Sequence, residues 1–328
     1  MLPRSDWTIE EITKIYHTPL IELIQHANQI HQDNHSSGEV QICTLLSIKT
    51  GGCTEDCAYC SQAARYNTGL NTENLLTYER VIESAKIAKD LGSTRFCMGA
   101  AWKEVRNNRD FDKVIKMIEG VSEMGLEVCG TLGMATEEQI LKMKNAGLHA
   151  YNHNIDTSED YYSDIISTHT HKDRMQTLKN IRNAGVTICS GGIIGMGESD
   201  KDRIKMLFSL ATLKKHPESV PINALVSIKG TPLQDRKEVN TWDMIRMIST
   251  TRIIMPKSMV RLSAGRLSMS KEAQALCFLA GANSIFSGEK LLTTPNPRVN
   301  EDQELFNLLG LTPRPSHKEN LPPKIICS

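Results

Sequence analysis

The amino-acid sequence predicts an α/β protein built as a TIM-type (β/α)8 barrel. Two observations lead to this fold: strand-like and helical segments alternate along the chain, and the same junction joins them repeatedly. The 328 residues are enough for one large barrel. An open doubly wound sheet shows the same alternation and is the alternative at this point.

The repeated junction consists of a helical pattern that ends in glycine and a strand-like run a few residues later. Glycine suits the left-handed backbone conformation that ends many helices. The junction glycines are Gly92, Gly125, Gly147, Gly185 and Gly281. The runs that follow them span 94–98, 126–129, 148–151, 186–189 and 282–286. Further strand candidates at 42–48, 222–228 and 259–263 complete a set of eight.

Three regions are expected along the chain. Residues 1–40 are predicted to form an N-terminal helical extension, because Thr8-x-x-Glu11 is typical of a capping box and the apolar helical pattern breaks near Pro19. Residues 41–310 are predicted to form the barrel. Residues 311–328 are rich in proline and polar side chains, which predicts a mobile C-terminal tail.

The composition excludes several classes of partner. The 38 basic residues balance 38 acidic ones, so no charge excess favours nucleic acid or a membrane surface. No apolar run reaches the roughly 20 residues that a membrane span requires, and the first 30 residues lack a continuous hydrophobic stretch. We therefore expect a soluble, cytoplasmic protein. Nine cysteines in a reducing compartment indicate metal ligands rather than disulfides.

Several predicted strands alternate between apolar and polar residues. Strands buried on both faces of a parallel sheet are usually hydrophobic throughout. The apolar face carries Phe96, Met98, Val128, Leu132, Val186, Ile188, Val260 and Leu262. The other face carries Arg95, Cys97, Glu127, Cys129, Thr131, Thr187, Cys189, Arg261 and Ser263. If the apolar face packs on the outer helices, the polar face lines the barrel interior, so we expect a cavity that contains chemistry.

Three cysteines with C-x3-C-x2-C spacing, Cys53, Cys57 and Cys60, follow the first predicted strand. Active sites of TIM barrels lie in such loops. A closed zinc site needs four ligands, whereas three thiolates on a 4Fe-4S cluster leave one iron open. A loop of inert cysteines and a zinc site completed from afar are the alternatives. Cys43 and Cys277 are interpreted as small buried hydrophobic residues and Cys327 as incidental.

The cysteine spacing, with Tyr59 before the last cysteine, resembles the signature of the radical S-adenosylmethionine superfamily. The resemblance implies that Cys53, Cys57 and Cys60 hold a 4Fe-4S cluster. It implies that the open iron binds the amino and carboxylate groups of S-adenosylmethionine. An electron from the cluster would then cleave a C–S bond and release a 5′-deoxyadenosyl radical. The protein would supply orientation and exclude water.

Further blocks resemble the biotin synthase family and together span nearly the whole predicted barrel. They include Cys-Ser-Gln at 60–62, Tyr-Asn-Thr-Gly-Leu at 66–70, Arg-Phe-Cys-Met-Gly-Ala-Ala-Trp at 95–102, Tyr-Asn-His-Asn-Ile-Asp-Thr-Ser at 151–158, Cys-Ser-Gly-Gly-Ile-Ile-Gly-Met-Gly-Glu at 189–198, Pro-Ile-Asn-Ala-Leu at 221–225, Lys-Gly-Thr-Pro-Leu at 229–233, Ser-Ala-Gly-Arg at 263–266 and Leu-Leu-Thr-Thr-Pro-Asn-Pro at 291–297. The resemblance implies a sulfurtransferase that converts dethiobiotin to biotin by radical insertion of sulfur between two carbons.

The same resemblance implies the ligands of the site. A second cluster, 2Fe-2S, would be the sulfur donor, with ligands Cys97, Cys129, Cys189 and Arg261. The S-adenosylmethionine contacts would be Tyr59, Ala100, Asn154, Asp156, Arg174 and Ile193, and the dethiobiotin contacts Asn154, Asn223, Thr293 and Thr294. The alternative for Arg261 is a buried cation that offsets cluster charge, since guanidinium offers no lone pair. For each of these polar residues, the alternative is that it only lines the barrel, with its hydrogen bonds satisfied by neighbouring residues.

The resemblance also implies a homodimer and an electron-donating partner of the flavodoxin or ferredoxin type. Two rival functions stay open at this point. One is another radical S-adenosylmethionine barrel enzyme, such as a cluster-maturation enzyme, which has no use for the three inward cysteines. The other is a non-catalytic iron–sulfur carrier or scaffold, which needs no large polar cavity.

Overall fold

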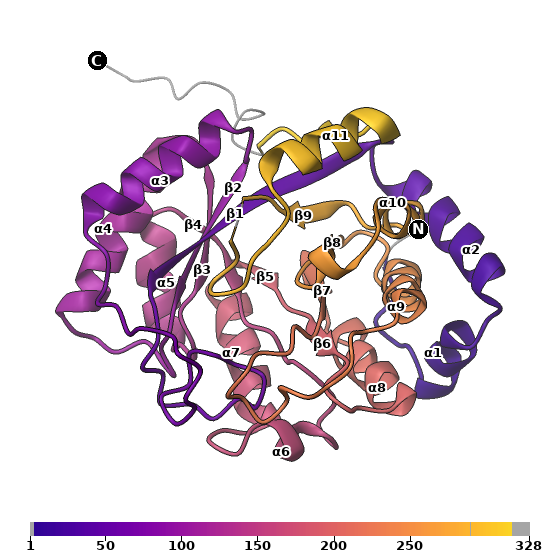
Figure 1. The fold of residues 1–328 in the computed structure, drawn as a ribbon, viewed down its shortest axis with the longest axis horizontal. Helices are drawn as coiled ribbons and strands as arrows, with labels where there is room; N and C mark the ends of the chain where they lie inside the picture. The colour runs from indigo at the N-terminus through magenta and orange to yellow at the C-terminus, as the bar shows by residue number, and fades with distance from the viewer. Residues whose placement is uncertain (1–2, 289, 317–328) are drawn as a thin grey trace.

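Parallel strands close into a barrel with helices around it in the computed structural model, which describes residues 3–288 and 290–316 (Figure 1). The strand order is β10-β1-β2-β3-β4-β5-β7-β8-β9, and β1 also pairs with β9, which closes the ring. The short strand β6 pairs with β7 beside β5. The predicted TIM-type barrel is confirmed, and the open doubly wound sheet is wrong.

The strands and helices alternate along the chain as predicted. The strands are β1 (Glu39–Lys49), β2 (Arg95–Ala100), β3 (Glu127–Thr131), β4 (Leu148–Asn152), β5 (Thr187–Cys189), β6 (Gly192–Ile194), β7 (Ser219–Ala224), β8 (Met259–Leu262), β9 (Ser284–Phe286) and β10 (Thr312–Pro313). The helices are α1 (Ile9–Tyr16), α2 (Leu20–Asn34), α3 (Tyr78–Asp90), α4 (Arg109–Glu123), α5 (Glu137–Asn145), α6 (Tyr162–Ile165), α7 (His171–Asn183), α8 (Asp200–Ala211), α9 (Thr241–Ile254), α10 (Lys271–Leu279) and α11 (Val299–Leu309).

The N-terminal extension consists of α1 and α2, which lie outside the ring of helices (Figure 1). Helix α1 starts at the predicted capping box, in which Thr8 and Glu11 satisfy each other's backbone N–H groups. Pro19 separates the two helices, as expected. Helix α2 packs on α9, and α1 packs on α8 and α9, so the extension covers one side of the barrel.

The predicted alternation of apolar and polar residues along the strands is confirmed. The predicted outward residues, among them Phe96 and Val128, belong to the main hydrophobic core under the helices. The register of β2 with β3 pairs Phe96 with Val128 and Cys97 with Cys129. Because successive side chains of a strand face opposite sides, this register turns both thiols into the barrel. The junction glycines also have positive φ angles, between 68° at Gly185 and 103° at Gly147.

The structure differs from the sequence-based prediction at three strands, one of which is β10, within the region predicted as a mobile tail. The strand predicted at 222–228 is β7, Ser219–Ala224. Residues 225–228 lie outside the sheet, and Leu225, Val226 and Ile228 line the cavity. Pro221 lacks an N–H and usually marks a strand end, yet here it lies inside β7. Strand β6 was not predicted, because the glycine-rich block at 189–198 lacks the usual strand residues.

The predicted C-terminal tail is partly placed by the structure. The backbone N–H groups of Thr312 and Arg314 donate to the carbonyls of Gly38 and Val40, so this segment runs along β1. Residues 317–328 of the tail, with Cys327, lie outside the described residues.

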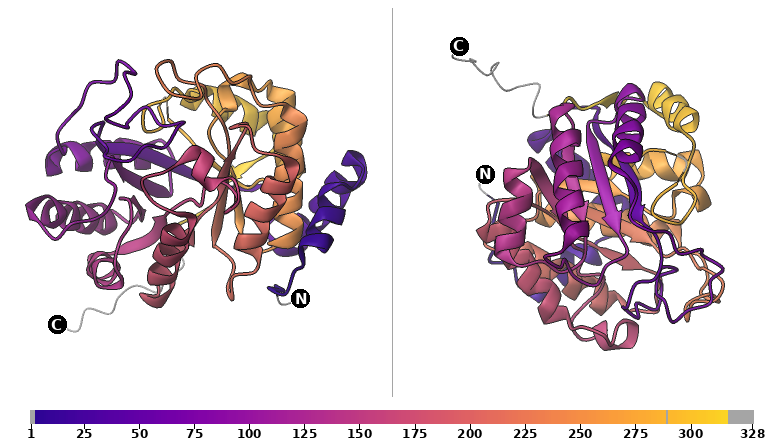
Figure 2. Two further views of the ribbon diagram at one scale, coloured as in Figure 1. Left: turned by 90° about the horizontal axis from the view of Figure 1, so that it is seen from below. Right: turned by 90° about the vertical axis from the view of Figure 1, so that its left-hand side faces the viewer.

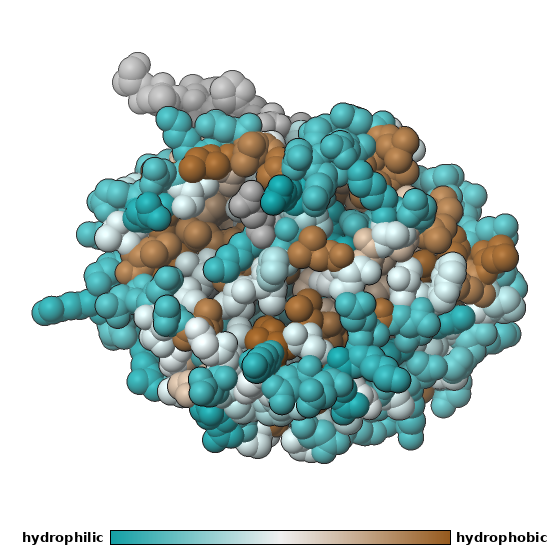
Figure 3. Space-filling view, viewed as in Figure 1, coloured by the Kyte–Doolittle hydropathy of each residue, from teal (hydrophilic) through white to brown (hydrophobic). Residues whose placement is uncertain are grey.

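The face in Figure 3 is mainly hydrophilic, with hydrophobic side chains in small separate groups. Within the two described ranges, no helix combines the length and the hydropathy needed to cross a bilayer. Figure 2 shows the indigo N-terminal helices α1 and α2 on the outside of the barrel.

The close approach of Gly191 to β7 gives a test of the fold. A Cβ at Gly191 would lie 1.9 Å from the carbonyl oxygen of Pro221, which is backbone and cannot rotate away. We expect Gly191→Ala to lower the free energy of unfolding by about 1–3 kcal/mol or more. The control is Gly130→Ala, whose Cβ would meet no neighbour closer than 3.4 Å. Chemical denaturation that shows equal losses for both variants would contradict the packing described here.

Candidate active site

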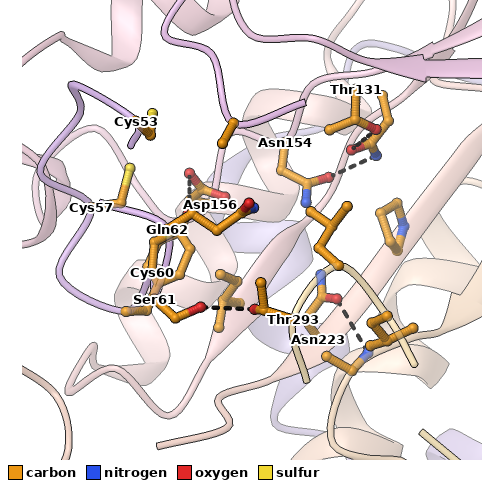
Figure 4. Close-up of a pocket in the computed structure, with 18 of the residues that line it drawn as sticks. Cys53, Cys57, Cys60, Ser61, Gln62, Thr131, Asn154, Asp156, Asn223 and Thr293 are labelled. Atoms are coloured by element: carbon orange, nitrogen blue, oxygen red, sulfur yellow. Dashed lines mark hydrogen bonds between the residues drawn. The ribbon is translucent and has the colours of Figure 1, made fainter. Parts of the chain in front are cut away.

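One cavity of about 330 Å³ lies at the carboxyl ends of the strands (Figure 4). Ala100, Thr131, Asn152 and Ala224 line it, and each is the last residue of its strand. Active sites of TIM barrels lie at this end. Every predicted site residue lines the cavity except Cys189, which contacts the lining residues Asn152 and Arg261.

The cysteine loop follows β1 and forms one end of the cavity. Cys53, Cys57 and Cys60 all line it, and Figure 4 shows Cys53 and Cys57 on the side opposite Asn223. The loop folds back on itself, because the N–H of Cys53 donates to the carbonyl of Gln62 and the carbonyl of Cys53 accepts from Ala64. The N–H of Cys60 donates to the carbonyl of Cys57. This compact loop brings the three cysteines to one region.

Two buried acids between the cysteines fix this loop to the segment before α7. Asp56 accepts hydrogen bonds from the N–H groups of Ser167, at 2.9 Å, and Thr168, at 3.1 Å. Glu55 lies 2.6 Å from Nδ1 of His169. Burial alone would raise the pKa of Asp56, but the hydrogen bonds from Ser167 and Thr168 hold it well below its usual range. The ionised carboxylate therefore suits these donors. No local pattern in the sequence predicts this contact, because the partners lie more than 100 residues apart.

Asp156 lies after β4 in a left-handed conformation that is uncommon outside glycine, with φ of 64°. Its carboxylate accepts a hydrogen bond from the Tyr59 hydroxyl at 2.9 Å and pairs with Nη2 of Arg174 at 3.2 Å. Its carbonyl accepts from the N–H of Ile193 at 2.8 Å. These contacts bring four of the predicted S-adenosylmethionine contacts together. Strain of this kind persists where surrounding contacts hold it, often at functional sites.

Two asparagines lie deeper in the cavity. Oδ1 of Asn154 accepts from the N–H of Gly191 at 3.2 Å. The amide of Asn223 donates to the carbonyl of Gly192 at 2.9 Å and accepts from the N–H of Ala264 at 3.3 Å. Each asparagine is thus fixed by backbone while its amide faces the cavity.

Thr293 and Thr294 lie on the loop after β9. Oγ of Ser61 and Oγ1 of Thr293 are 2.8 Å apart, which joins this loop to the cysteine loop (Figure 4). The carbonyl of Thr294 accepts from the N–H of Leu291 at 2.9 Å. The two predicted threonines therefore lie at the cavity wall beside the cysteine loop.

A second group of thiols lies deeper in the barrel. Cys97, Cys129 and Cys189 are almost completely buried, and the first two are neighbours across β2 and β3. Nδ2 of Asn152 donates to Sγ of Cys189 at 3.2 Å. Nη1 of Arg261 donates to the same sulfur at 3.5 Å. The structure therefore brings the four predicted ligands of the second cluster to one place.

Arg261 is completely buried and held from several sides. Its Nε donates to Oγ of Ser284 at 2.9 Å, and Nη2 lies 3.4 Å from Oε1 of Gln41. Its guanidinium carbon lies 4.6 Å from the centre of the Phe286 ring. Burial would lower the pKa of Arg261, but the neighbouring thiols raise it above its ordinary value. The charged form is therefore favoured where thiolates surround it.

The buried pair Arg95 and Glu127 closes the barrel beneath the thiols. Their charged atoms lie 2.9 Å apart, and Gln41 donates to the same carboxylate at 3.2 Å. A buried charge left unpaired would be costly, so the pair explains why two charged residues face the interior at this level.

Cys43 lies beside the inner thiols, although the sequence-based analysis did not include it among the candidate site residues. It is completely buried, as expected, but it lies among the inner thiols and not in the main hydrophobic core. Its Sγ accepts from Nη2 of Arg261 at 3.3 Å. Burial alone would raise the pKa of the Cys43 thiol, but its hydrogen bond with Cys97 and the charges of Arg261 and Arg95 lower it. Alternate residues of a strand share one face, so Gln41, Cys43 and Leu45 all face the barrel interior. This period-two pattern of β1 could have revealed the position of Cys43.

The two thiol groups fit iron–sulfur clusters. All of their cysteines are free. Across residues 3–288 and 290–316, no three His, Cys, Asp or Glu side chains converge on a single metal ion. The thiolates of a cluster bind separate irons at its corners and are spaced more widely. The three outer thiols would leave one iron of a 4Fe-4S cluster free for a small molecule.

Comparison with known proteins agrees with this site. The family model of the Radical SAM superfamily matches residues 47–210, which include the cysteine loop, and that of the Biotin and Thiamin Synthesis associated domain matches residues 221–312. Methylornithine synthase has the same fold, with a TM-score of 0.80 at 18% identity over 95% of both chains. The fold and the cysteine loop thus define a radical S-adenosylmethionine protein.

Relatives with high sequence identity show to which family within this class the chain belongs. The chain is 61% identical to biotin synthase of Cytophaga hutchinsonii, over 98% of this chain and 96% of that protein. It is 57% identical to the mitochondrial biotin synthase of Arabidopsis thaliana, over 95% and 83%. The relative from Nostoc sp. is 55% identical, over 97% and 96%. The chain belongs to the biotin synthase family.

The contacts of Asp56 give a test of the loop's attachment. The N–H groups of Ser167 and Thr168 both donate to Oδ1 of Asp56, whereas the Ser167 hydroxyl and Arg65 donate to Oδ2. Asp56→Asn replaces Oδ2 with an NH2 group and removes the charge, so these two donors lose their acceptor at a cost of about 1–3 kcal/mol. We expect faster proteolysis within residues 50–72 and less iron bound after anaerobic reconstitution. Asp90→Asn, at the exposed end of α3, is the control and should change neither. Equal protection and iron content in the two variants would contradict the assigned role of Asp56.

Proposed function

We propose that this chain converts dethiobiotin to biotin, as a sulfurtransferase that uses radicals from S-adenosylmethionine. The observation that carries the proposal is a cavity that joins an outer loop of three cysteines to an inner group of thiols around Arg261. Membership in the biotin synthase family supports the same reaction. A carrier or scaffold has no need for such a cavity, and another radical enzyme of this fold has no need for the inner thiols.

The outer site is assigned to Cys53, Cys57 and Cys60 as the ligands of the 4Fe-4S cluster, and the inner site to Cys97, Cys129, Cys189 and Arg261 as those of the 2Fe-2S cluster. When bound, the outer cluster supplies the electron that cleaves S-adenosylmethionine to a 5′-deoxyadenosyl radical, and the inner cluster supplies the sulfur. The chain's own residues bind and orient the two substrates between these sites and exclude water.

The S-adenosylmethionine contacts are assigned to the residues around Asp156. Its carboxylate, fixed by Tyr59 and Arg174, suits a ribose hydroxyl as a hydrogen-bond acceptor. The backbone of Ile193 and the small side chain of Ala100 leave room for the adenosyl group. Asn154 lies between this pocket and the inner thiols, so we assign it contacts with both substrates.

The dethiobiotin contacts are assigned to Asn223, Thr293 and Thr294, together with Asn154. An amide matches a cyclic urea, since both donate and accept, and Asn223 keeps its plane fixed by two backbone contacts. The threonine hydroxyls would hold the carboxylate tail. Leu291, Leu292 and Phe286 line the cavity nearby and suit the aliphatic chain between the two ends.

Further assignments rest on the family alone. They are a homodimer and an electron-donating partner of the flavodoxin or ferredoxin type. The cytoplasmic location rests on composition, and the boundaries at residues 40 and 310 between extension, barrel and tail rest on the sequence pattern.

The reaction itself is the first test. Anaerobic, reconstituted protein incubated with a reductant, S-adenosylmethionine and dethiobiotin should form 5′-deoxyadenosine and biotin. Formation of neither product by protein that carries both clusters would refute the function. Formation of 5′-deoxyadenosine without biotin would favour another radical enzyme.

The two cysteine groups should respond to substitution in different ways. Cys53→Ala, Cys57→Ala or Cys60→Ala should abolish cleavage of S-adenosylmethionine, because the outer cluster needs all three thiolates. Cys97→Ala, Cys129→Ala or Cys189→Ala should remove the 2Fe-2S absorbance and biotin formation while the 4Fe-4S cluster remains. Unchanged iron and sulfide content in the second set would refute the inner ligand assignment.

A further inference from the structure

Cys43 occupies a position in the inner site that its small size alone does not explain. Its Sγ lies 3.3 Å from Nη2 of Arg261 and 3.9 Å from Oγ of Ser284, and it is a hydrogen-bond neighbour of Cys97. A thiol kept only for its volume would lie among apolar groups, as Cys277 does in the main core under the helices. Cys43 instead contacts the charged end of a completely buried arginine.

The guanidinium of Arg261 spans two sulfurs. Nη1 donates to Cys189 and Nη2 to Cys43, so the two thiols lie on the two terminal nitrogens of one side chain. Its other hydrogen-bond partners among the described residues are Ser284 and Gln41, and neither carries a charge. Because Nη2 of Arg261 lies 3.3 Å from Sγ of Cys43, any iron held by Arg261 would have the Cys43 sulfur nearby.

We propose that Cys43 is a fourth iron-ligating thiol of the inner site and exchanges with Arg261 as the ligand of one iron. The inference rests on the proposed function, which supplies the inner 2Fe-2S cluster. A thiolate is a far better iron ligand than a guanidine, which binds metal only after losing its proton. The exchange balances: the Fe–N bond to neutral Arg261 breaks, an Fe–S bond to Cys43 forms, and the thiol proton of Cys43 passes to the guanidine.

This exchange needs no other reactant and no change of oxidation state. The proton travels between groups that are already in hydrogen-bond contact. Once protonated, Arg261 keeps its contacts with Ser284 and Gln41 and remains as a buried cation beside an all-thiolate cluster. The inner site thus has two ligand sets, one with Arg261 and one with Cys43.

The test compares Arg261→Leu, alone and combined with Cys43→Ala or Cys277→Ala, after anaerobic reconstitution with iron and sulfide. The readouts are iron and sulfide content and the Mössbauer spectrum. We expect Arg261→Leu and Arg261→Leu/Cys277→Ala to keep a 2Fe-2S cluster with four sulfur ligands, and Arg261→Leu/Cys43→Ala to lose it. Equal inner cluster content in the two double variants would overturn the proposal, and so would loss of the cluster from Arg261→Leu alone.

A second measurement uses variants that retain Arg261, because the Arg261 variants can fail by folding poorly. Cys43→Ala should lose its inner cluster to an iron chelator several-fold faster than Cys277→Ala or the unaltered chain, because the alternative ligand is absent. Equal rates would overturn the proposal. If the unaltered chain binds no inner cluster, the proposed function itself is refuted. Failure of the proposed function and failure of the Cys43 proposal therefore give different results.

Discussion

The pairing register of the parallel strands is the constraint on which the whole site depends. In β2 and β3 it sets Cys97 beside Cys129, and in β4 and β5 it sets Asn152 beside Cys189. A slip of one residue would turn the thiols outward and drive Phe96 and its neighbours into the cavity. The hydrophobic layer under the helices therefore fixes the inner site, because the register that buries the apolar side chains is the one that gathers the sulfurs.

A polar barrel interior needs compensation, and the structure provides it in layers. Arg95 and Glu127 pair at the bottom, Arg261 lies among thiols in the middle, and Asp156 pairs with Arg174 near the mouth. Each charge has a partner of opposite sign or a set of polarisable sulfurs beside it, so none is buried alone. These layers follow one another along the barrel axis. The region assigned to radical formation is therefore separate from the region assigned to sulfur transfer.

The sequence predicted most of the fold because the period-two pattern and the junction glycines are local signals. It did not predict β6, where glycines allow a close backbone contact with Pro221. It also misplaced the end of β7. It did not place Cys43 beside the inner thiols, because both faces of β1 carry apolar side chains, such as Leu45 and Leu46. The contacts of Asp56 with Ser167 and Thr168 could not be predicted at all, since nothing in the local pattern joins residues so far apart.

The origin of the sulfur in the product tests the central claim most directly. The inner cluster would be reconstituted with isotopically labelled sulfide, and one turnover would be run anaerobically with S-adenosylmethionine and dethiobiotin. If the inner thiols hold the sulfur donor, the label appears in biotin while the inner cluster's absorbance is lost and the outer cluster's is kept. Unlabelled biotin, or loss of the outer cluster in proportion to biotin formed, would contradict the account.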